Sequence, residues 1–164
     1  MSDWIDSFYA DVDAQLTERV LDRFTPDGEL VFGSNPPAIG HPAMREVLEN
    51  LRAALSGMRH EWCNRWTVDE KTLVLETRVH YTTRGGTEVI LPSVSVIDRD
   101  ASGLITSLRI HIDAAPLFGA LDAESVTAQP EPAASHEAAG RPAGARVERR
   151  PDPVERGGIH CPNK

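Results

Sequence analysis

The sequence has little cysteine, little positive charge, few aromatic residues and no long apolar run. Its two cysteines, Cys63 and Cys161, are too few for a disulfide scaffold, and we expect a cytoplasmic protein. Lys and Arg number 17 against 25 Asp and Glu, and the net charge of −8 argues against nucleic acid and anionic membranes as partners. No apolar run approaches the roughly 18 residues of a membrane-spanning helix, and the acidic start of the chain differs from a signal peptide. The remaining class is a globular protein.

The composition changes after Leu121. Residues 122–164 contain no aromatic residue and half of the 12 prolines. Such a stretch buries too little apolar surface to offset the entropy lost on ordering. We therefore predict one domain over residues 1–121 and a disordered tail over residues 122–164.

Helical periodicity marks the first part of the chain. Apolar residues three and four apart over residues 5–24 predict a helix, interrupted near residues 16–19. A second helix is predicted over residues 42–57, with proline in its first turn and glycine at its end. A short strand over residues 29–33 lies between them.

Apolar and polar residues then alternate over four stretches joined by short turns: residues 59–68, 72–83, 87–98 and 104–113. Short connections make neighbouring strands antiparallel. Residues 116–118 are predicted to close the domain as a short turn. Together these elements predict an α+β fold, a cone-shaped curled antiparallel sheet with the N-terminal helices packed on its concave face.

Four stretches resemble the nuclear transport factor 2-like superfamily, which includes SnoaL-like polyketide cyclases, ketosteroid isomerases and limonene epoxide hydrolases. They are Phe24–Asp27, Pro36–Gly40, Leu75–His80 and Gly103–Asp113. The resemblance implies the same cone-shaped fold and a pocket for a small apolar ligand. Because the superfamily hosts many activities, it does not name a reaction.

The epoxide hydrolases of this fold use an arginine between two acids, with a Tyr and an Asn that hold water. By resemblance Arg78 keeps the arginine, whereas His80 and Ile110 replace the two acids. Leu30 and Phe32 stand at the Tyr and Asn positions. Neither Ile110 nor these two residues can do that chemistry, so epoxide hydrolysis by the family route is disfavoured.

The isomerase and cyclase residues are also mostly replaced. The isomerase Tyr falls on Phe8, its base near Phe32 and its second acid near Ser95. The late aspartate of the SnoaL-type cyclases falls on Ile110, with His111 and Asp113 close by. Only a strand irregularity would restore that match.

The orientation of residues 72–83 decides the site. Glu76, Arg78 and His80 share one face, and simple patterning would expose that face as a stripe of ion pairs. The resemblance instead points them into the cone and leaves the apolar face for a second copy, a homodimer through the sheet. We predict the inward orientation. His80 is then the acid–base candidate and Arg78 the electrostatic stabiliser.

Secondary proton partners are predicted at His111 and Asp113, although Asp113 also suits a helix cap or turn. The predicted pocket wall comprises His60, Trp62 and Trp66, which with Asn64 alternate along one strand, together with Phe32, Glu76 and Ile110. The two tryptophans are equally compatible with core or dimer contacts. No pattern indicates a metal or a cofactor.

The leading hypothesis is a cofactor-independent isomerase, cyclase, dehydratase or hydrolase acting on an apolar cyclic or carbonyl metabolite. The alternative is a non-catalytic ligand-binding or dimerisation module of the same fold. A third possibility is a subunit that assists a larger assembly through its tail.

Overall fold

The computed structural model describes residues 4–127. The elements follow in the order α1 (Trp4–Asp13), α2 (Thr17–Leu21), β1 (Phe24–Phe32), β2 (Ala38–Ile39), α3 (Gly40–Ala54), β3 (Leu55–Thr67), β4 (Thr72–Thr83), β5 (Glu88–Arg99), β6 (Ile105–Ile112) and α4 (Ala115–Thr127). The predicted α+β fold class is confirmed.

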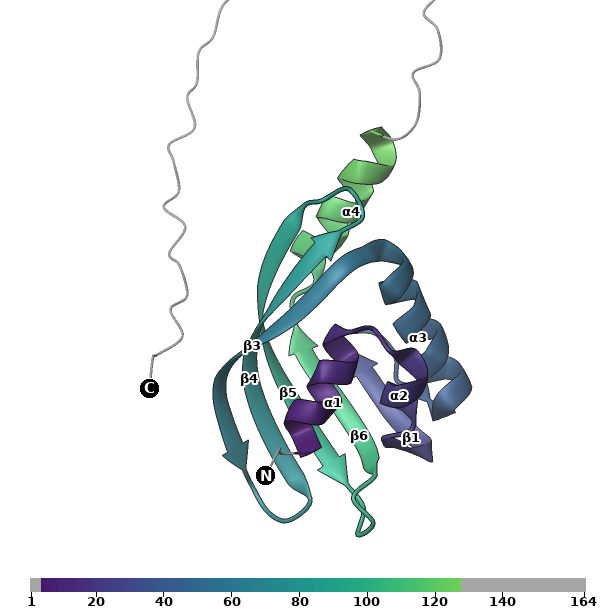
Figure 1. The fold of residues 1–164 in the computed structure, drawn as a ribbon, viewed down its shortest axis with the longest axis vertical. Helices are drawn as coiled ribbons and strands as arrows, with labels where there is room; N and C mark the ends of the chain where they lie inside the picture. The colour runs from purple at the N-terminus through teal and green to yellow at the C-terminus, as the bar shows by residue number, and fades with distance from the viewer. Residues whose placement is uncertain (1–3, 128–164) are drawn as a thin grey trace, which may run out of the picture. The chain divides into compact units, whose positions relative to one another are not determined.

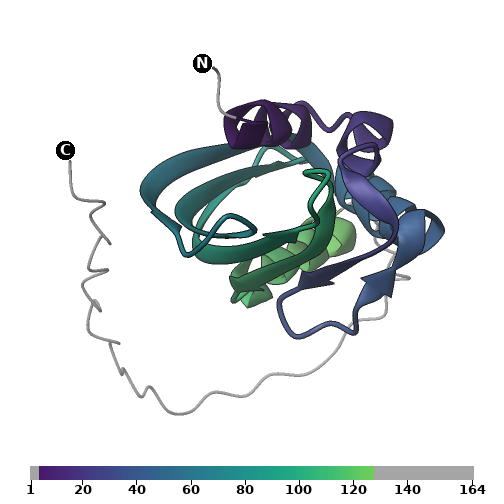
Figure 2. The same cartoon turned by 90° about the horizontal axis from the view of Figure 1, so that it is seen from below.

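The strands form one sheet in the order β2-β1-β6-β5-β4-β3. Neighbours are antiparallel except β1 and β6, which run parallel. The sheet curls around its interior, and α1 and α2 lie along its open side (Figure 2). This curvature leaves a concave inner face toward the helices and a convex outer face.

Helices α1, α2 and α3 lie on the inner side of the sheet (Figure 1), where each buries apolar side chains. Ile5 and Phe8 of α1 and Met44 of α3 are fully buried. They pack against inward-facing strand residues such as Leu75 and Ile97. A second apolar cluster, around Leu55, Val79, Tyr81, Leu91 and Leu117, lies toward α4.

Several predicted boundaries are wrong. The helical stretch predicted to reach residue 24 ends at Leu21, and the strand predicted over residues 29–33 begins at Phe24. The second helix ends at Ala54, and Gly57 lies inside β3, because backbone pairing with β4 already begins at Leu55 opposite Thr83. The predicted turn at residues 116–118 is the start of the 13-residue helix α4. Leu117 anchors that helix in the core.

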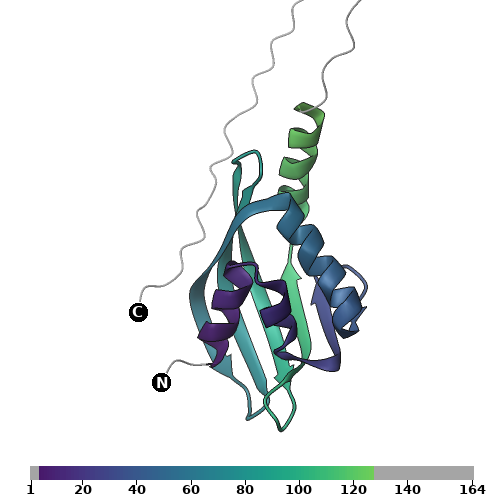
Figure 3. The same ribbon diagram turned by 45° about the vertical axis from the view of Figure 1, so that its right-hand side comes forward.

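Helix α4 lies beside the hairpin between β4 and β5 (Figure 3). The carboxylate of Glu124 accepts hydrogen bonds from the Thr83 hydroxyl and, at 3.0 Å, from the backbone N–H of Gly85. Residues 122–127, predicted as tail, are therefore part of a helix. The rest of the predicted disordered tail lies outside the described residues.

Candidate active site

A cavity lies between the helices and the inner face of the sheet. Its free interior is about 80 Å³, several times the space of one water molecule. Most of its lining is apolar, including Phe8, Val20, Met44, Leu48, Leu108 and Ile110. Concave, mostly apolar cavities with a few polar groups are the usual sites for small organic ligands.

Strand register explains the apolar floor of the cavity. In the parallel pair, Leu30 lies opposite Leu108 and Phe32 opposite Ile110. All four side chains line the cavity. Side chains directly opposite on paired strands share a face, so this register presents one continuous hydrocarbon surface to a ligand.

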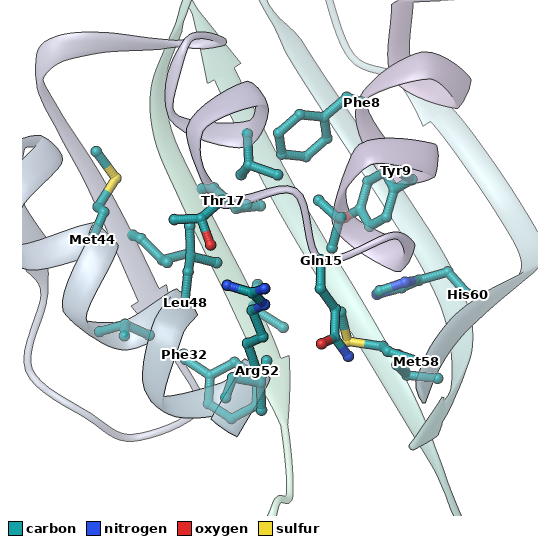
Figure 4. A pocket seen from close by; sticks show the side chains of 18 of the residues that line it. Phe8, Tyr9, Gln15, Thr17, Phe32, Met44, Leu48, Arg52, Met58 and His60 are labelled. Atoms are coloured by element: carbon teal, nitrogen blue, oxygen red, sulfur yellow. The ribbon is translucent and has the colours of Figure 1, made fainter. Parts of the chain in front are cut away.

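The polar feature of the cavity is the pair formed by Asp13 and His60. Asp13 is the last residue of α1, and His60 lies on β3 and lines the cavity (Figure 4). Asp13 Oδ1 lies 2.6 Å from His60 Nδ1, and Asp13 Oδ2 accepts the His60 backbone N–H at 3.0 Å. We call these two residues the Asp13–His60 pair.

The position of Asp13 is unfavourable without this partner. The C-terminal end of a helix carries partial negative charge, which disfavours a carboxylate there. The two hydrogen bonds from His60 compensate it. A residue whose position is unfavourable in its own helix, and which is stabilised by hydrogen bonds from a distant strand, is typical of a functional site.

The chain conformation after α1 brings a third polar side chain to the cavity. Gln15 has a φ of 55°, the only positive φ of a non-glycine residue within residues 4–127. This left-handed residue separates α1 from α2, and its side chain lines the cavity (Figure 4). Such strained backbone clusters at ligand-binding positions.

Two tyrosines complete the polar lining. The Tyr9 ring lies edge-on to the His60 ring, with centroids 4.7 Å apart. Burial raises the pKa of Tyr9 to about 12; the Ser95 side chain opposes that rise and Asp13 adds to it. Within residues 4–127 the buried Tyr9 hydroxyl has no hydrogen-bond partner. Burial also raises the pKa of Tyr81 above its usual range.

This arrangement can transfer a proton. Because Asp13 accepts from Nδ1, the other imidazole nitrogen, Nε2, is left as an acceptor, and it has no partner among the described residues. Within residues 4–127, no group of three or more His, Cys, Asp or Glu side chains is placed to hold a metal ion. The chemistry that these side chains offer is acid–base.

The structure brings only part of the predicted site to the cavity. Phe32, His60 and Ile110 line it. Sequence reasoning gave His60 only a place in the wall, and it missed Asp13 and Tyr9 as its neighbours. That these residues bind a substrate stays a prediction.

The predicted inward orientation of the charged stripe on β4 is wrong. Burial alternates strictly along β4, and Val79 and Tyr81, not Arg78 or His80, line the cavity. The apolar side chains of β4 pack against the helices on the inner face. Burying the charged side chains of β4 inside the cone would instead cost a large desolvation free energy. Glu76 likewise lies on the outer face, where it accepts a hydrogen bond from Asn64 at 2.7 Å.

His80 is held on the outer face by two carboxylates. Its Nε2 lies 3.0 Å from Glu61 and its Nδ1 lies 3.2 Å from Glu88. The His80 hydrogen bond holds the pKa of Glu61 below its usual value. We call these three residues the Glu61–His80–Glu88 cluster; it corresponds to the ion-pair stripe that simple patterning indicated.

The two predicted tryptophans lie on opposite faces of β3. Trp62 pairs with Thr77, but Asn64 pairs with Glu76, so Cys63 is an extra residue that forms a β-bulge. Trp62 therefore stays on the inner face, with its ring centroid 5.1 Å from that of Tyr9. Trp66 lies on the outer face, and the prediction that all four alternating residues share one face is wrong.

The last two predicted catalytic residues do not reach the cavity either. His111 is exposed on β6 opposite Val94, on the outer face. Asp113 accepts the backbone N–H of Ala115 at 3.1 Å, at the start of α4. The role that this contact supports for Asp113 is the helix cap.

The comparisons with known proteins agree with this fold. The family model of the SnoaL-like domain matches residues 5–108, and the chain belongs to that family. No curated protein matches its sequence. No helix within residues 4–127 has both the length and the apolar character needed to cross a membrane.

Three solved structures illustrate the similarity. A candidate polyketide cyclase from Xanthomonas campestris pv. campestris matches with a TM-score of 0.63 and 16% identity, over 71% of this chain and 93% of that one. The epoxide hydrolase/cyclase-like enzyme SalBIII, which acts in pyran ring formation in salinomycin, gives 0.60 and 18%, over 66% and 87%. TerC, crystallised with polyporic acid, gives 0.62 and 22%, over 72% and 95%. At these identities the likeness shows the fold.

Proposed function

We propose that this chain is a cofactor-independent enzyme that performs general acid–base chemistry on an apolar cyclic metabolite bearing a carbonyl. The observation that carries the proposal is His60, which lines the cavity with Nδ1 fixed by Asp13 and Nε2 without a partner among residues 4–127. Imidazole is the side chain best suited to exchange protons near neutral pH. Two solved neighbours support a ring-bearing small-molecule ligand: SalBIII acts in pyran ring formation, and TerC was crystallised with polyporic acid.

The chemical step follows from the groups in the cavity. His60 Nε2 removes a proton from the carbon next to the carbonyl, and the electron pair of that C–H bond moves to form an enolate. Tyr9 is the hydrogen-bond donor for the enolate oxygen. Its pKa of about 12 keeps the hydroxyl protonated at neutral pH. The protonated imidazole then returns the proton to the same or another atom of the ligand.

A generic ketone tests this step without knowledge of the natural substrate. 2-Tetralone is a bicyclic apolar ketone whose protons next to the carbonyl exchange with deuterium through the enolate. In D₂O at neutral pD, the full chain should speed this exchange at least about 100-fold over the same concentration of free imidazole, as followed by proton NMR. Binding of 2-tetralone with no faster exchange would make the chain a ligand-binding module and refute the proposed activity.

We also propose that two copies pair through the outer face of the sheet. The apolar face of β4, predicted to contact the second copy, is buried on the inner side of the sheet and is not available for this contact. Other apolar side chains remain on the outer face: Trp66 and Ile90 are each 49% exposed, and Val94 is 36% exposed. These three side chains are the exposed apolar surface that the outer face of β3 and β5 offers to a second copy.

Sedimentation equilibrium tests the pairing. The full chain should sediment at twice its chain mass, and Val94→Asp should shift it to the monomer because a carboxylate would be buried in the interface. Val126→Asp is the matched control, since Val126 is 75% exposed on α4. A monomeric wild-type chain would contradict the proposal.

A further inference from the structure

The mouth of the cavity carries a positive charge that the proposed proton transfer does not use. Arg52, in the last turn of α3, lines the cavity together with Gln15 and Thr17. In Figure 4 its side chain projects into the cavity from α3, whereas His60 projects from the opposite side. Among residues 4–127, Arg52 is the one Lys or Arg that lines this cavity.

Most of the hydrogen-bonding capacity of Arg52 is unused within residues 4–127. Its Nη1 donates to Glu49 Oε2 at 3.2 Å, and its Nε and Nη2 have no partner there. The other carboxylate oxygen of Glu49 accepts a hydrogen bond from the Thr17 hydroxyl. Glu49 therefore contacts the guanidinium through Nη1 alone and leaves the edge formed by Nε and Nη2 available to a ligand.

The ion pair with Glu49 leaves Arg52 able to bind a second carboxylate. The Arg52 and Glu49 side chains are 57% and 44% exposed, and an ion pair this exposed contributes little free energy. A carboxylate that arrives from the cavity can form two parallel hydrogen bonds with the free edge of a guanidinium, the geometry in which Arg is most selective.

The shape of the cavity separates the two ends of a ligand. Most of the lining of the cavity is hydrocarbon, so the apolar ring of a ligand lies inside and a charged substituent extends to the mouth. Arg52 is the cation that the mouth presents to such a substituent.

We propose that Arg52 binds a carboxylate at the mouth, so that the ligand is a ring-bearing organic acid. The inference rests on the proposed function only in taking this cavity as the binding site. The protein carries a net charge of −8, and an acid therefore binds here through the local guanidinium and not through long-range attraction.

Two ligands of the same shape test the assignment. Isothermal titration calorimetry of the full chain at pH 7.5 should show that 2-naphthoate binds at least about tenfold more tightly than neutral 2-naphthamide. Arg52→Gln should remove about tenfold of the naphthoate affinity and change the naphthamide affinity by less than about twofold. Circular dichroism checks that the exposed substitution leaves the fold intact.

Arg45→Gln is the matched control. Arg45 lies on the same helix and pairs with Glu18 away from the cavity. Its substitution by Gln changes the net charge by the same amount as Arg52→Gln. It should change neither affinity by more than about twofold. Equal losses in Arg45→Gln and Arg52→Gln, or no measurable naphthoate binding by the wild-type chain at millimolar concentration, would overturn the inference.

A third variant tests where the carboxylate of the bound naphthoate lies. In His60→Gln the preference for naphthoate should persist, and its loss would place the carboxylate at the imidazole instead of Arg52. The result is separate from the proton-transfer test on 2-tetralone. Arg52-dependent naphthoate binding without ketone exchange refutes only the enzyme, and ketone exchange with naphthoate binding that is independent of Arg52 refutes only this inference.

Discussion

The inner and outer faces of the sheet each hold one histidine against carboxylates, and the two are not equivalent. His60, on the inner face, contacts one carboxylate through Nδ1 and keeps Nε2 free toward the cavity. His80, on the outer face, has a carboxylate at each ring nitrogen. Both imidazoles are mostly buried, at 11% and 15% side-chain exposure. Burial is therefore the same for both rings, and what distinguishes the proposed proton acceptor is an Nε2 without a partner within residues 4–127, on a residue that lines the cavity.

The largest expected difference is in catalysis. His60→Gln should slow deuterium exchange into 2-tetralone by about 100-fold to 1,000-fold, because the proton acceptor is lost. His80→Gln should change the rate by less than about twofold, because that ring lies on the other face of the sheet. NMR exchange rates at equal protein concentration measure both. Equal rate losses in the two variants would contradict the assignment of His60, and not His80, as the proton acceptor.

The carboxylate partners should differ in the same way. Asp13 acts through His60, so Asp13→Asn should lower kcat for exchange by about tenfold to 100-fold with little change in KM, because orientation is lost while the apolar binding surface remains. Asp13→Glu should recover part of the rate. Glu61→Gln, the matched change at His80, should leave kcat unchanged. A change in KM alone for Asp13→Asn would mean that the residue serves only to shape the cavity.

The tyrosines give a smaller effect that reports on the inner face alone. The chain has two tyrosines, both with a pKa raised by burial, that of Tyr9 to about 12. A raised folded-state pKa contributes stability below the unfolded value of about 10 and loses it as the pH rises toward 12. The melting temperature should therefore fall above pH 10, and less steeply in Tyr9→Phe. Absorbance at 295 nm should show little tyrosinate in the folded protein at pH 10, and full ionisation there would contradict this.

The smallest effect concerns the outer face. The pKa of Glu61 is lowered by its hydrogen bond to His80, so its contribution to stability is present above the unfolded value and is lost as the pH falls through the folded one. Glu61→Gln should remove that part of the acid sensitivity, seen as a melting temperature that falls slightly less between pH 5 and pH 3. Because Glu61 is well exposed, a large change would mean that the outer face stabilises the fold more than its geometry indicates.

The repeating patterns of the sequence were enough to predict the helical segments before β3 and the four long strands, but not α4, because only elements that pack on the inner face require apolar residues at fixed periods. The choice of face on β4 was also present in that pattern, in the alternation of Leu75, Val79 and Tyr81 with charged residues. Reliance on family resemblance led to the wrong choice. Simple burial of hydrocarbon was the stronger constraint.

The site itself was less accessible from sequence. Asp13 and His60 are 47 residues apart, and no local motif joins a helix end to a distant strand. The available signal was the spacing of Tyr9 and Asp13, four residues apart and so on one face of a helix. The bulge at Cys63, which separates Trp62 from Trp66, depends on pairing between two strands and has no mark in the residues themselves.

The contact between α1 and β3 has a consequence for how the protein can change. The Asp13 carboxylate that orients the His60 imidazole also holds the end of α1 against the edge strand β3. A variant that weakens this contact is therefore expected to widen the cavity, and so bind larger ligands, while it transfers protons more slowly. Substrate range and turnover rate are expected to change in opposite directions when this one contact is altered.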